Sequence, residues 1–480
     1  MATLNVAIIY LVSRMKDTMD IHIVCKDNKY FVFCPAALRV FSVTEEIGKI
    51  LKFYETCSKD IHSIAEMFNR TEYQINDIIN YICKYATDDS IKDLEWDDDG
   101  PMVLNLMISQ DCNLRCAYCY AEHGSYGCEK KLMNFDTAKR STDKLFNKAR
   151  DNRIVFFGGE PFLNFSLMKD LDSYLSMKGM AAKYTTVTNG TIMNHEIKNF
   201  INGKFFNLCI SLDGTKEIND VHRYGNMESV HDCVLNTISI LEPRNYSISV
   251  KSVVTKKSLD GLMDNIEYIN SLDVDSMAAE PVHYMPPESD LFLSDKDLTK
   301  YVQEMVKISV EQIRKMARGE RVVIMSHTFD ILRQILTKTR KINMCSGGRE
   351  FITITADGDV YPCHMYIGVD EFRMGNVHDA DFPGKRFKRI RDIFNNINVY
   401  SSPECSSCWA RFLCGGECTW LSYIYNNNLY QPVEQRCMLM KSLIDALLPE
   451  IAEIFQDKIK TKNLINALKT KRGTMSLSPC

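Results

Sequence analysis

The cysteines of this 480-residue chain are grouped, and the grouping constrains what the chain can fold into. Eighteen cysteines are present, and ten of them form three groups. The groups are Cys112, Cys116 and Cys119; then Cys345 and Cys363; then Cys405, Cys408, Cys414, Cys418 and Cys437. In a large chain without a signal peptide, clustered cysteines indicate metal more often than disulfides. The sequence therefore predicts that metal supports part of the fold.

The remaining composition is that of an ordinary globular protein. Hydrophobic residues make up 45% of the chain, and its net charge of −4 gives no reason to expect nucleic-acid binding. The apolar stretch from Val6 to Val12 has neither the basic residues nor the cleavage site of a signal peptide, and no stretch is long enough to span a membrane. We therefore expect a cytoplasmic protein without a nucleic-acid or membrane partner.

The N-terminal part is expected to form a small α+β unit. Its elements are the strands Ile21–Val24 and Tyr30–Phe33, a helix from Ser42 to Tyr54, and the helices Ile61–Phe68 and Glu72–Tyr85. Ser42 is predicted to cap the first helix, because Glu45 lies three residues later and completes a capping box. A polar break from Asp97 to Pro101 predicts the end of this unit.

The middle of the chain alternates strands and helices. The expected strands are Val103–Ile108, Arg153–Phe157, Tyr184–Thr188, Phe206–Ser211, Ser247–Val254 and Ser276–Val282. The expected helices are Thr137–Arg150, Ser166–Met177, Glu196–Ile201, Val230–Leu241 and Leu259–Leu272. Six units of this kind predict an α/β fold, a partial (β/α)6 barrel, with its chemistry at the carboxyl ends of the strands.

The chain is expected to divide into five parts. These are an N-terminal extension (1–19), the small α+β unit (20–96), the barrel (102–320), a cysteine-rich region (321–450) and a basic tail (451–480). The barrel part ends with a long amphipathic helix from Asp295 to Arg318.

The first cysteine group follows a predicted strand in the spacing C-x3-C-x2-C. Cys112, Cys116 and Cys119 can hold three irons of a [4Fe–4S] cluster and leave the fourth iron open to a small molecule. A zinc site or three buried thiols are the alternative interpretations of the spacing alone.

The residues around this group add a resemblance to a known family. The stretch from Cys112 to Tyr120, with the aromatic Tyr118 before the third cysteine, resembles the signature of the radical S-adenosylmethionine (SAM) enzymes. The resemblance covers roughly residues 102–440. It implies that SAM binds the open iron and that one electron splits it into a 5′-deoxyadenosyl radical.

Further motifs resemble the SAM contacts of this family. Gly158, Gly159 and Glu160 match a segment in which the backbone and the carboxylate contact the methionine amine, since Glu160 supplies an acceptor for an ammonium group. The resemblance also implies contacts from Asn189, from Ser211 to a ribose hydroxyl, and from Arg223 to the SAM carboxylate. Ordinary turns or salt bridges are the alternative roles for these residues.

The C-terminal cysteines resemble the SPASM domain, which carries two auxiliary [4Fe–4S] clusters in radical SAM enzymes that modify peptides. The family ligand order implies an outer cluster on Cys405, Cys408, Cys414 and Cys437. It implies an inner cluster on Cys345, Cys363 and Cys418. Structural zinc is the alternative for the four-cysteine core alone.

The chain departs from the anaerobic sulfatase-maturating enzymes at the inner cluster. Those enzymes have one more cysteine a few residues before the first, whereas Lys338 to Met344 contain none. Our hypothesis is that the inner cluster has an open iron that binds a cysteine thiolate of a peptide. The alternative is a fourth ligand from elsewhere, such as Cys128 or a carboxylate.

The N-terminal unit is similar in element order to the winged-helix-like elements with which such maturases bind leader peptides. An exposed strand edge can accept a leader as an added strand. A packing unit without a ligand is the alternative, and DNA binding is disfavoured because the unit has no marked excess of basic residues.

Together these features resemble the sactipeptide and ranthipeptide maturases. The resemblance implies an anaerobic radical SAM enzyme that forms thioether crosslinks in a ribosomally made cysteine-rich precursor peptide with a leader. It also implies a flavodoxin or ferredoxin as electron donor, because clusters of low potential need a strong donor. The alternatives are formylglycine formation on a sulfatase, carbon–carbon crosslinking, or a non-catalytic iron–sulfur protein that binds leaders or transfers electrons.

Overall fold

The structure is a computed structural model that describes residues 20–57, 60–86, 92–93, 102–147, 151–283 and 285–469. Three expected features lie outside these residues: the extension 1–19, the break from Asp97 to Pro101, and the end of the basic tail from residue 470 onward. Among the described residues, no helix combines the length and the apolar character that a membrane span requires.

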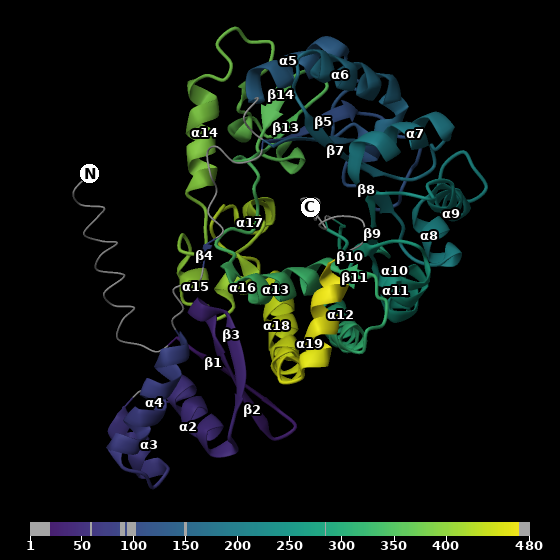
Figure 1. Cartoon of the computed structure of the whole chain (residues 1–480). Helices are drawn as coiled ribbons and strands as arrows, with labels where there is room; N and C mark the ends of the chain where they lie inside the picture. Colours follow the sequence, from purple (N-terminus) through teal and green to yellow (C-terminus); the bar gives the residue numbers. More distant parts are fainter. Residues whose placement is uncertain are drawn as a thin grey trace.

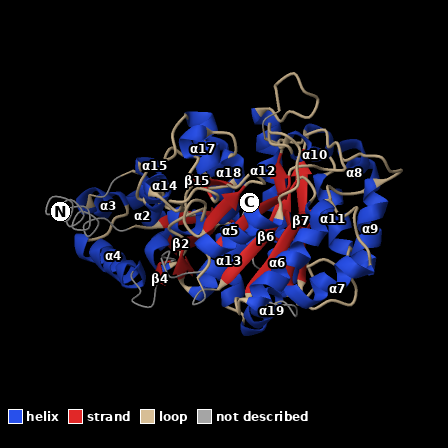
Figure 2. Cartoon of the chain, turned by 90° about the horizontal axis from the view of Figure 1, so that it is seen from above, coloured by secondary structure: helices blue, strands red, loops and turns tan. Residues whose placement is uncertain are grey.

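A ten-stranded sheet forms the centre of the molecule (Figures 1 and 2). Its order is β11-β10-β9-β8-β7-β6-β5-β13-β14-β15. The strands of the barrel are β5 (Val103–Ser109), β6 (Asn152–Gly158), β7 (Ala182–Thr188), β8 (Phe205–Ser211), β9 (Ser247–Val254), β10 (Ser276–Pro281) and β11 (Ile324–Met325). Neighbours in this part pair in parallel, so the expected α/β barrel with six strands is confirmed, and β11 extends it.

Helices cover the outer face of this sheet, as Figure 2 shows for α6, α7, α9 and α11. They are α5 (Phe135–Leu145), α6 (Phe165–Met177), α7 (His195–Lys204), α8 (Lys216–His222), α9 (Val230–Ile240), α10 (Lys256–Leu259), α11 (Leu262–Ser271), α12 (Asp295–Ala317) and α13 (Ser326–Thr337). Leu208, Ile210, Ile248 and Val250 are almost fully buried toward these helices. The short helix α8 was not predicted, and Leu259–Leu272 forms two helices in place of one.

The N-terminal unit has one more strand than expected. Its elements are β1 (His22–Lys26), β2 (Lys29–Cys34), β3 (Arg39–Val43), α2 (Glu45–Thr56), α3 (Ile61–Met67) and α4 (Glu72–Ala86). The prediction that Ser42 caps the first helix was wrong, because Ser42 lies in β3 and pairs with Phe31. Thr44 is the cap, and its side chain accepts a hydrogen bond from the amide of Ile47.

The cysteine-rich region is joined to the barrel through the sheet. Its strands are β13 (Phe351–Ile354), β14 (Asp359–Tyr361) and β15 (Gly375–Asn376), and a two-residue strand β12 (Thr339–Arg340) pairs with β4 (Lys92–Asp93). Its helices are α14 (Lys385–Asn395), α15 (Pro403–Ser406), α16 (Arg411–Cys414), α17 (Thr419–Asn426), α18 (Glu434–Phe455) and α19 (Lys458–Leu468). β13 pairs in parallel with β5. α18 continues across residue 450, where we expected the tail to begin.

The N-terminal unit lies against α18 and the cysteine-rich region, below them in Figure 1. The imidazole of His22 stacks on Trp409 with ring centroids 3.6 Å apart, and its Nε2 lies 2.6 Å from a carboxylate oxygen of Asp445. Lys26 forms an ion pair with Glu450, and Asp20 pairs with the buried Arg411. Charged contacts therefore fix the unit next to the C-terminal cysteines.

Candidate functional site

The first cysteine group lies in the loop that follows β5, where the barrel rule places chemistry. The sulfur of Cys112 accepts the amide of Leu114 at 3.4 Å, and the sulfur of Cys119 accepts the amide of His123 at 3.2 Å. Burial raises the pKa of Cys112, and that of Cys116 to about 12. Buried sulfurs that receive amide N–H groups are well suited to bind iron as thiolates.

Two neighbouring segments hold this loop in place. The amides of Arg115 and Ala117 donate to the carbonyls of Tyr224 and His222, at 2.7 and 2.8 Å. On the other side, the backbone turns through positive φ angles at Glu122, His123 and Tyr126. Non-glycine residues rarely adopt such angles, so the segment after Cys119 is conformationally strained.

The glycines before Glu160 pack against the loop that leads to Cys112. A Cβ on Gly158 would lie 2.0 Å from the carbonyl oxygen of Ser109, and one on Gly159 would lie 2.3 Å from that of Asp111. The amide of Glu160 donates to the same Asp111 carbonyl at 2.9 Å. These glycines therefore permit close contact with the protein's own backbone, and the expected contact of this segment with SAM stays a prediction.

Glu160 is fully buried and accepts several hydrogen bonds. Its carboxylate accepts the amides of Phe162 and Asn189, at 3.1 and 2.8 Å, and the hydroxyl of Thr188 at 2.9 Å. Burial nevertheless raises the pKa of Glu160 to about 7, against these donors. An added cation such as an ammonium group would favour the ionised form.

Asn189 connects Glu160 to the cysteine loop. Its amide nitrogen lies 3.7 Å from the sulfur of Cys112 and 2.9 Å from the side-chain oxygen of Asn113. Its own oxygen accepts the hydroxyl and the amide of Thr191. The structure therefore brings Asn189 and Glu160 next to the first cysteine group.

Arg223 is paired with a residue that we had not singled out, Asp213. Its guanidinium donates two hydrogen bonds to the Asp213 carboxylate, at 3.0 and 3.1 Å, and lies over the ring of Tyr118. Burial would lower the pKa of Arg223, but the carboxylate raises it. Two of its five N–H donors are thus used within the protein. Ser211 lies half-buried at the end of β8, two residues before Asp213.

The cysteines of the expected inner cluster share one buried neighbour, a tyrosine. The thiols of Cys345, Cys363 and Cys418 all lie near the Tyr366 hydroxyl and, with burial as the main cause, raise its pKa. His364, which follows Cys363, has its Nδ1 3.4 Å from the Cys363 sulfur. The ring of His364 lies 4.7 Å from that of Phe157, next to Gly158. The fold thus brings this group close to the barrel loops.

The cysteines of the expected outer cluster lie in α15 (Cys405), between α15 and α16 (Cys408), at the end of α16 (Cys414) and in the first turn of α18 (Cys437). The thiols of Cys408 and Cys414 lie near Cys405, and those of Cys414 and Cys405 lie near Cys437. A small hollow with a volume of about 20 Å³ is lined by Cys345, Cys405, Gly347, Gly415 and Gly416. A Cβ on Gly347 would lie 3.3 Å from the sulfur of Cys345, so this glycine permits close contact with the sulfur.

Within the described residues, no three His, Cys, Asp or Glu side chains converge closely enough to bind one metal ion. In a cubane cluster each thiolate binds a different iron, so its ligands lie further apart than those of one ion. The possible fourth ligand Cys128 is exposed, and its thiol lies near Tyr361, two residues before Cys363.

Two family models match segments of the chain. Residues 106–268 match the radical SAM superfamily, and residues 345–409 match SPASM, an iron–sulfur cluster-binding domain. The chain therefore contains a radical SAM domain and a SPASM domain. A radical SAM domain implies SAM and a [4Fe–4S] cluster, and a SPASM domain implies further iron–sulfur, as predicted. The SPASM match ends before Cys414, Cys418 and Cys437.

Related proteins cover most of the same residues. A cysteine-type anaerobic sulfatase-maturating enzyme of Clostridium novyi is 26% identical over 335 residues, 65% of this chain and 85% of that protein. The antilisterial bacteriocin subtilosin biosynthesis protein AlbA of Bacillus subtilis is 25% identical over 287 residues, 58% of each chain. The solved structure of native anSMEcpe with bound AdoMet has a TM-score of 0.61 and 21% identity, and covers 75% of this chain and 100% of that chain. At this identity the likeness shows a shared fold.

Proposed function

We propose that this radical SAM/SPASM enzyme forms thioether crosslinks in a cysteine-rich precursor peptide. The observation that carries the proposal is the position of the Cys345, Cys363 and Cys418 group, which reaches the barrel loops through the contact of His364 with Phe157. AlbA, a relative of this chain, is a bacteriocin biosynthesis protein, which supports a peptide substrate.

The first group of residues would hold the [4Fe–4S] cluster and SAM. Cys112, Cys116 and Cys119 would bind the cluster, which supplies the electron for cleavage of SAM. Glu160 would accept the methionine ammonium, a role that its pKa of about 7 favours because a bound cation restores the ionised form. We assign the remaining contacts to Gly158, Gly159, Asn189, Tyr118 and Ser211, with the free donors of Arg223 directed to the carboxylate.

The C-terminal cysteines would bind two auxiliary [4Fe–4S] clusters. Cys405, Cys408, Cys414 and Cys437 supply four thiolates to the outer one, whereas Cys345, Cys363 and Cys418 supply three to the inner one. An inner cluster with three protein thiolates can accept the thiolate of a substrate cysteine. This arrangement would hold the sulfur that closes the thioether bond.

The N-terminal unit would bind the leader of the peptide. Within the described residues, β3 pairs with β2 alone, so its other edge can accept an added strand. Aromatic rings of α4 lie beside this edge: Tyr85 is 5.4 Å from Phe41 of β3, and Tyr81, 54% exposed, is 5.1 Å from Tyr85. We further propose a cytoplasmic, anaerobic setting and a flavodoxin or ferredoxin as the electron donor.

Formylglycine formation is the second candidate function. It is favoured by the similarity to the C. novyi sulfatase-maturating enzyme, which extends over 85% of that protein. The two candidates differ in what a substrate cysteine does, since it remains as a thioether sulfur in the first and loses its sulfur in the second.

Spectroscopy of the inner cluster tests the proposal. The anaerobically reconstituted protein should show an altered EPR spectrum when a synthetic cysteine-containing peptide is added, and no change with its serine analogue. A Cys128→Ser variant should keep this response, and Cys233→Ser serves as its control. An unaltered spectrum with the cysteine peptide would refute direct ligation.

SAM turnover tests the enzyme assignment itself. With dithionite as reductant, the protein should release 5′-deoxyadenosine, and a variant with Cys112, Cys116 and Cys119 all replaced by Ala should release none. Zinc without sulfide in the anaerobically purified protein would contradict the assignment.

A further inference from the structure

Charged side chains of β9 and β10 line the inner face of the barrel, several strands away from β5 in the sheet. Lys251 of β9 pairs with Ser211 of β8 and with Ala278 of β10, and Glu280 pairs with Val253. Side chains alternate along a strand, so Ser211, Lys251 and Glu280 lie on one face. The other face carries the buried apolar residues that pack on the helices, and the charged face is therefore the interior of the barrel.

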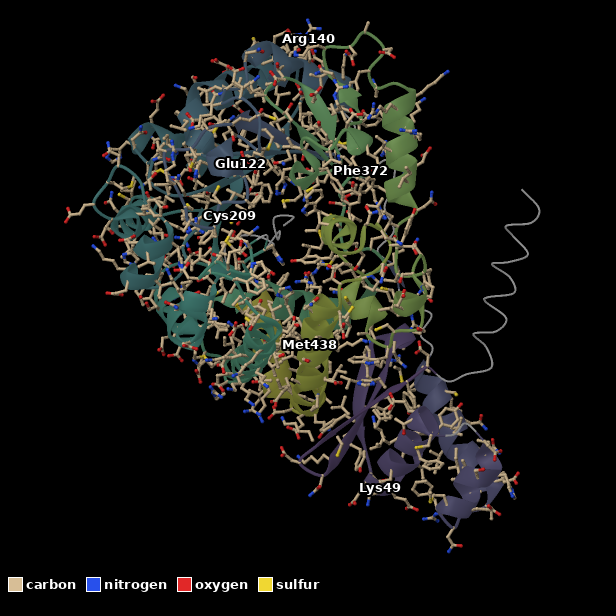
Figure 3. All side chains as sticks on the ribbon, turned by 180° about the vertical axis from the view of Figure 1, so that it is seen from behind. Lys49, Glu122, Arg140, Cys209, Phe372 and Met438 are labelled. Carbon is tan, nitrogen blue, oxygen red and sulfur yellow. The ribbon has the colours of Figure 1, made fainter. Side chains whose placement is uncertain are left out.

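This charged group lies next to Arg223, one of the residues beside the first cysteine group. Burial raises the pKa of Cys209, and the nearby cations of Lys251 and Arg223 lower it. Both cations therefore lie close to the Cys209 thiol, which Figure 3 shows toward the middle of the molecule. A ligand held by Lys251 would lie near the Arg223–Asp213 pair.

Glu280 faces two groups from the C-terminal half of the chain. One carboxylate oxygen lies 3.6 Å from Nε2 of His327, and the other lies 3.6 Å from Nη1 of Arg436. Burial lowers the pKa of His327 to about 4, so its imidazole is neutral. Burial would raise the pKa of Glu280, but the nearby cations of Arg436 and Lys251 hold it below its usual value. Glu280 is thus an anion at neutral pH.

These charged groups have unused hydrogen-bonding capacity. In the described part of the chain, the side chains of Lys251, Glu280 and Arg436 form no hydrogen bond, although that of Arg436 is only 16% exposed and that of Glu280 only 29%. The Nδ1 of His327, a residue 8% exposed, is also buried without a partner. Buried polar atoms in proteins are almost always hydrogen-bonded, so the unpaired Nδ1 of His327 indicates that a polar group binds here.

We propose that Lys251, Glu280 and Arg436 form a clamp for the peptide backbone of the substrate. The Glu280 carboxylate accepts an amide N–H, and the two cations donate to carbonyl oxygens of the same segment. This inference rests on the proposed peptide substrate and adds the residues that hold it inside the barrel. The clamp binds amide groups and is therefore independent of the side chains of the peptide.

Arg436 also lies near Cys414, so a variant of Arg436 could affect the expected outer cluster as well as the clamp. It precedes Cys437, and its cation lowers the pKa of Cys414 against the effect of burial. The decisive variants are therefore Glu280→Leu and Lys251→Met, which lie on barrel strands and are not adjacent in sequence to any cysteine of the expected clusters. Glu311→Leu on α12 is the matched control, because that side chain is 47% exposed and pairs with Arg318.

The probe is N-acetylserine N-methylamide, which has two amide groups and no thiol. Its affinity for the anaerobically reconstituted protein is measured by equilibrium dialysis. We expect Glu280→Leu and Lys251→Met to weaken binding about tenfold each, the loss typical for a hydrogen bond to a charged group, and Glu311→Leu to leave it unchanged.

A second probe tests the clamp without any variant. N-acetylserine methyl ester lacks the C-terminal N–H, so it should bind the unaltered protein about tenfold more weakly than the methylamide. This difference should disappear in Glu280→Leu. Equal affinity for amide and ester, or variants that bind the amide as the unaltered protein does, would overturn the clamp. Because the probes carry no thiol, that result would leave the EPR response to cysteine peptides, and with it the proposed function, intact.

Discussion

The hydroxyl of Tyr118 donates a hydrogen bond to the carboxylate of Asp213, the same group that pairs with Arg223. All three side chains are buried. Tyr118 lies between two cysteines of the first group, so this contact ties the cysteine loop of β5 to the end of β8, three strands away in the sheet order. The ion pair of Arg223 and Asp213 thus helps to hold the cysteine loop in position at the proposed SAM site.

Replacement of Asp213 by Ala should strongly destabilise the protein. The change leaves the Arg223 cation buried without its partner, and the loss of one member of a buried ion pair typically costs about 3–5 kcal/mol in the free energy of unfolding. Urea unfolding of the metal-free protein measures it. Asp260→Ala is the control, because Asp260 is 87% exposed and its pair with Lys300 should contribute at most about 1 kcal/mol. Similar midpoints for both variants would contradict this interpretation.

Replacement of Gly159 by Ala should displace the cysteine loop. The added methyl group would lie 2.3 Å from the Asp111 carbonyl, and relief of such overpacking costs about 1–3 kcal/mol. We expect less iron in the reconstituted protein and slower release of 5′-deoxyadenosine. Gly203→Ala is the matched control, since a Cβ there meets nothing within 4 Å. Equal iron content in the two variants would show that the loop adapts.

Glu160 should make stability depend on pH in a definite direction. Its pKa is raised from 4.5 to about 7, so the folded protein keeps its proton while the unfolded chain loses it. The stabilisation of the folded state by the raised pKa of Glu160 is fully present below pH 4.5 and is lost as pH rises through 7. The free energy of unfolding should fall by about 3 kcal/mol over this range. Unfolding of the metal-free protein and of Glu160→Gln at pH 5 and pH 7.5 should show this loss in the unaltered protein only. A parallel pH dependence in both would contradict it.

The contact between the N-terminal unit and α18 should weaken at alkaline pH. Burial lowers the pKa of His22, but hydrogen bonds to Asp445 and Glu55 raise it above 6.5 overall. The stabilisation is therefore present below pH 6.5 and is lost as pH rises through the raised value. Limited proteolysis at pH 6 and pH 8.5 should show release of the unit at the higher pH. His22→Phe keeps the stacking on Trp409 and should remove the pH dependence. Release at the same rate at both pH values would refute the role of His22.

The barrel could be predicted from the sequence because its signals are local. Each of the six strands is rich in apolar and β-branched residues, and β9 begins and ends where the pattern placed it. The division of ten cysteines into three groups followed from their spacing in the sequence. The third strand of the N-terminal unit was missed, because Arg39–Val43 is only partly buried and gains its conformation by pairing with β2.

Contacts across long sequence distances were the part that could not be predicted. Asp213 lies two residues after the predicted Ser211, but its pairing with Arg223 and Tyr118 depends on how the strands align. Glu280 and Arg436 are 156 residues apart (436 − 280), and nothing local signals their proximity. His364 could have been noticed earlier, because it directly follows a cysteine.

The pairing of β13 with β5 makes the cysteine-rich region part of the same sheet as the barrel. Phe351–Ile354 satisfy the backbone groups along one side of β5, the strand that delivers the first cysteine loop. A shortened protein that ends before residue 351 would leave this edge of β5 unpaired, and unpaired strand edges promote aggregation. Fragments of this enzyme that end before residue 351 should therefore precipitate.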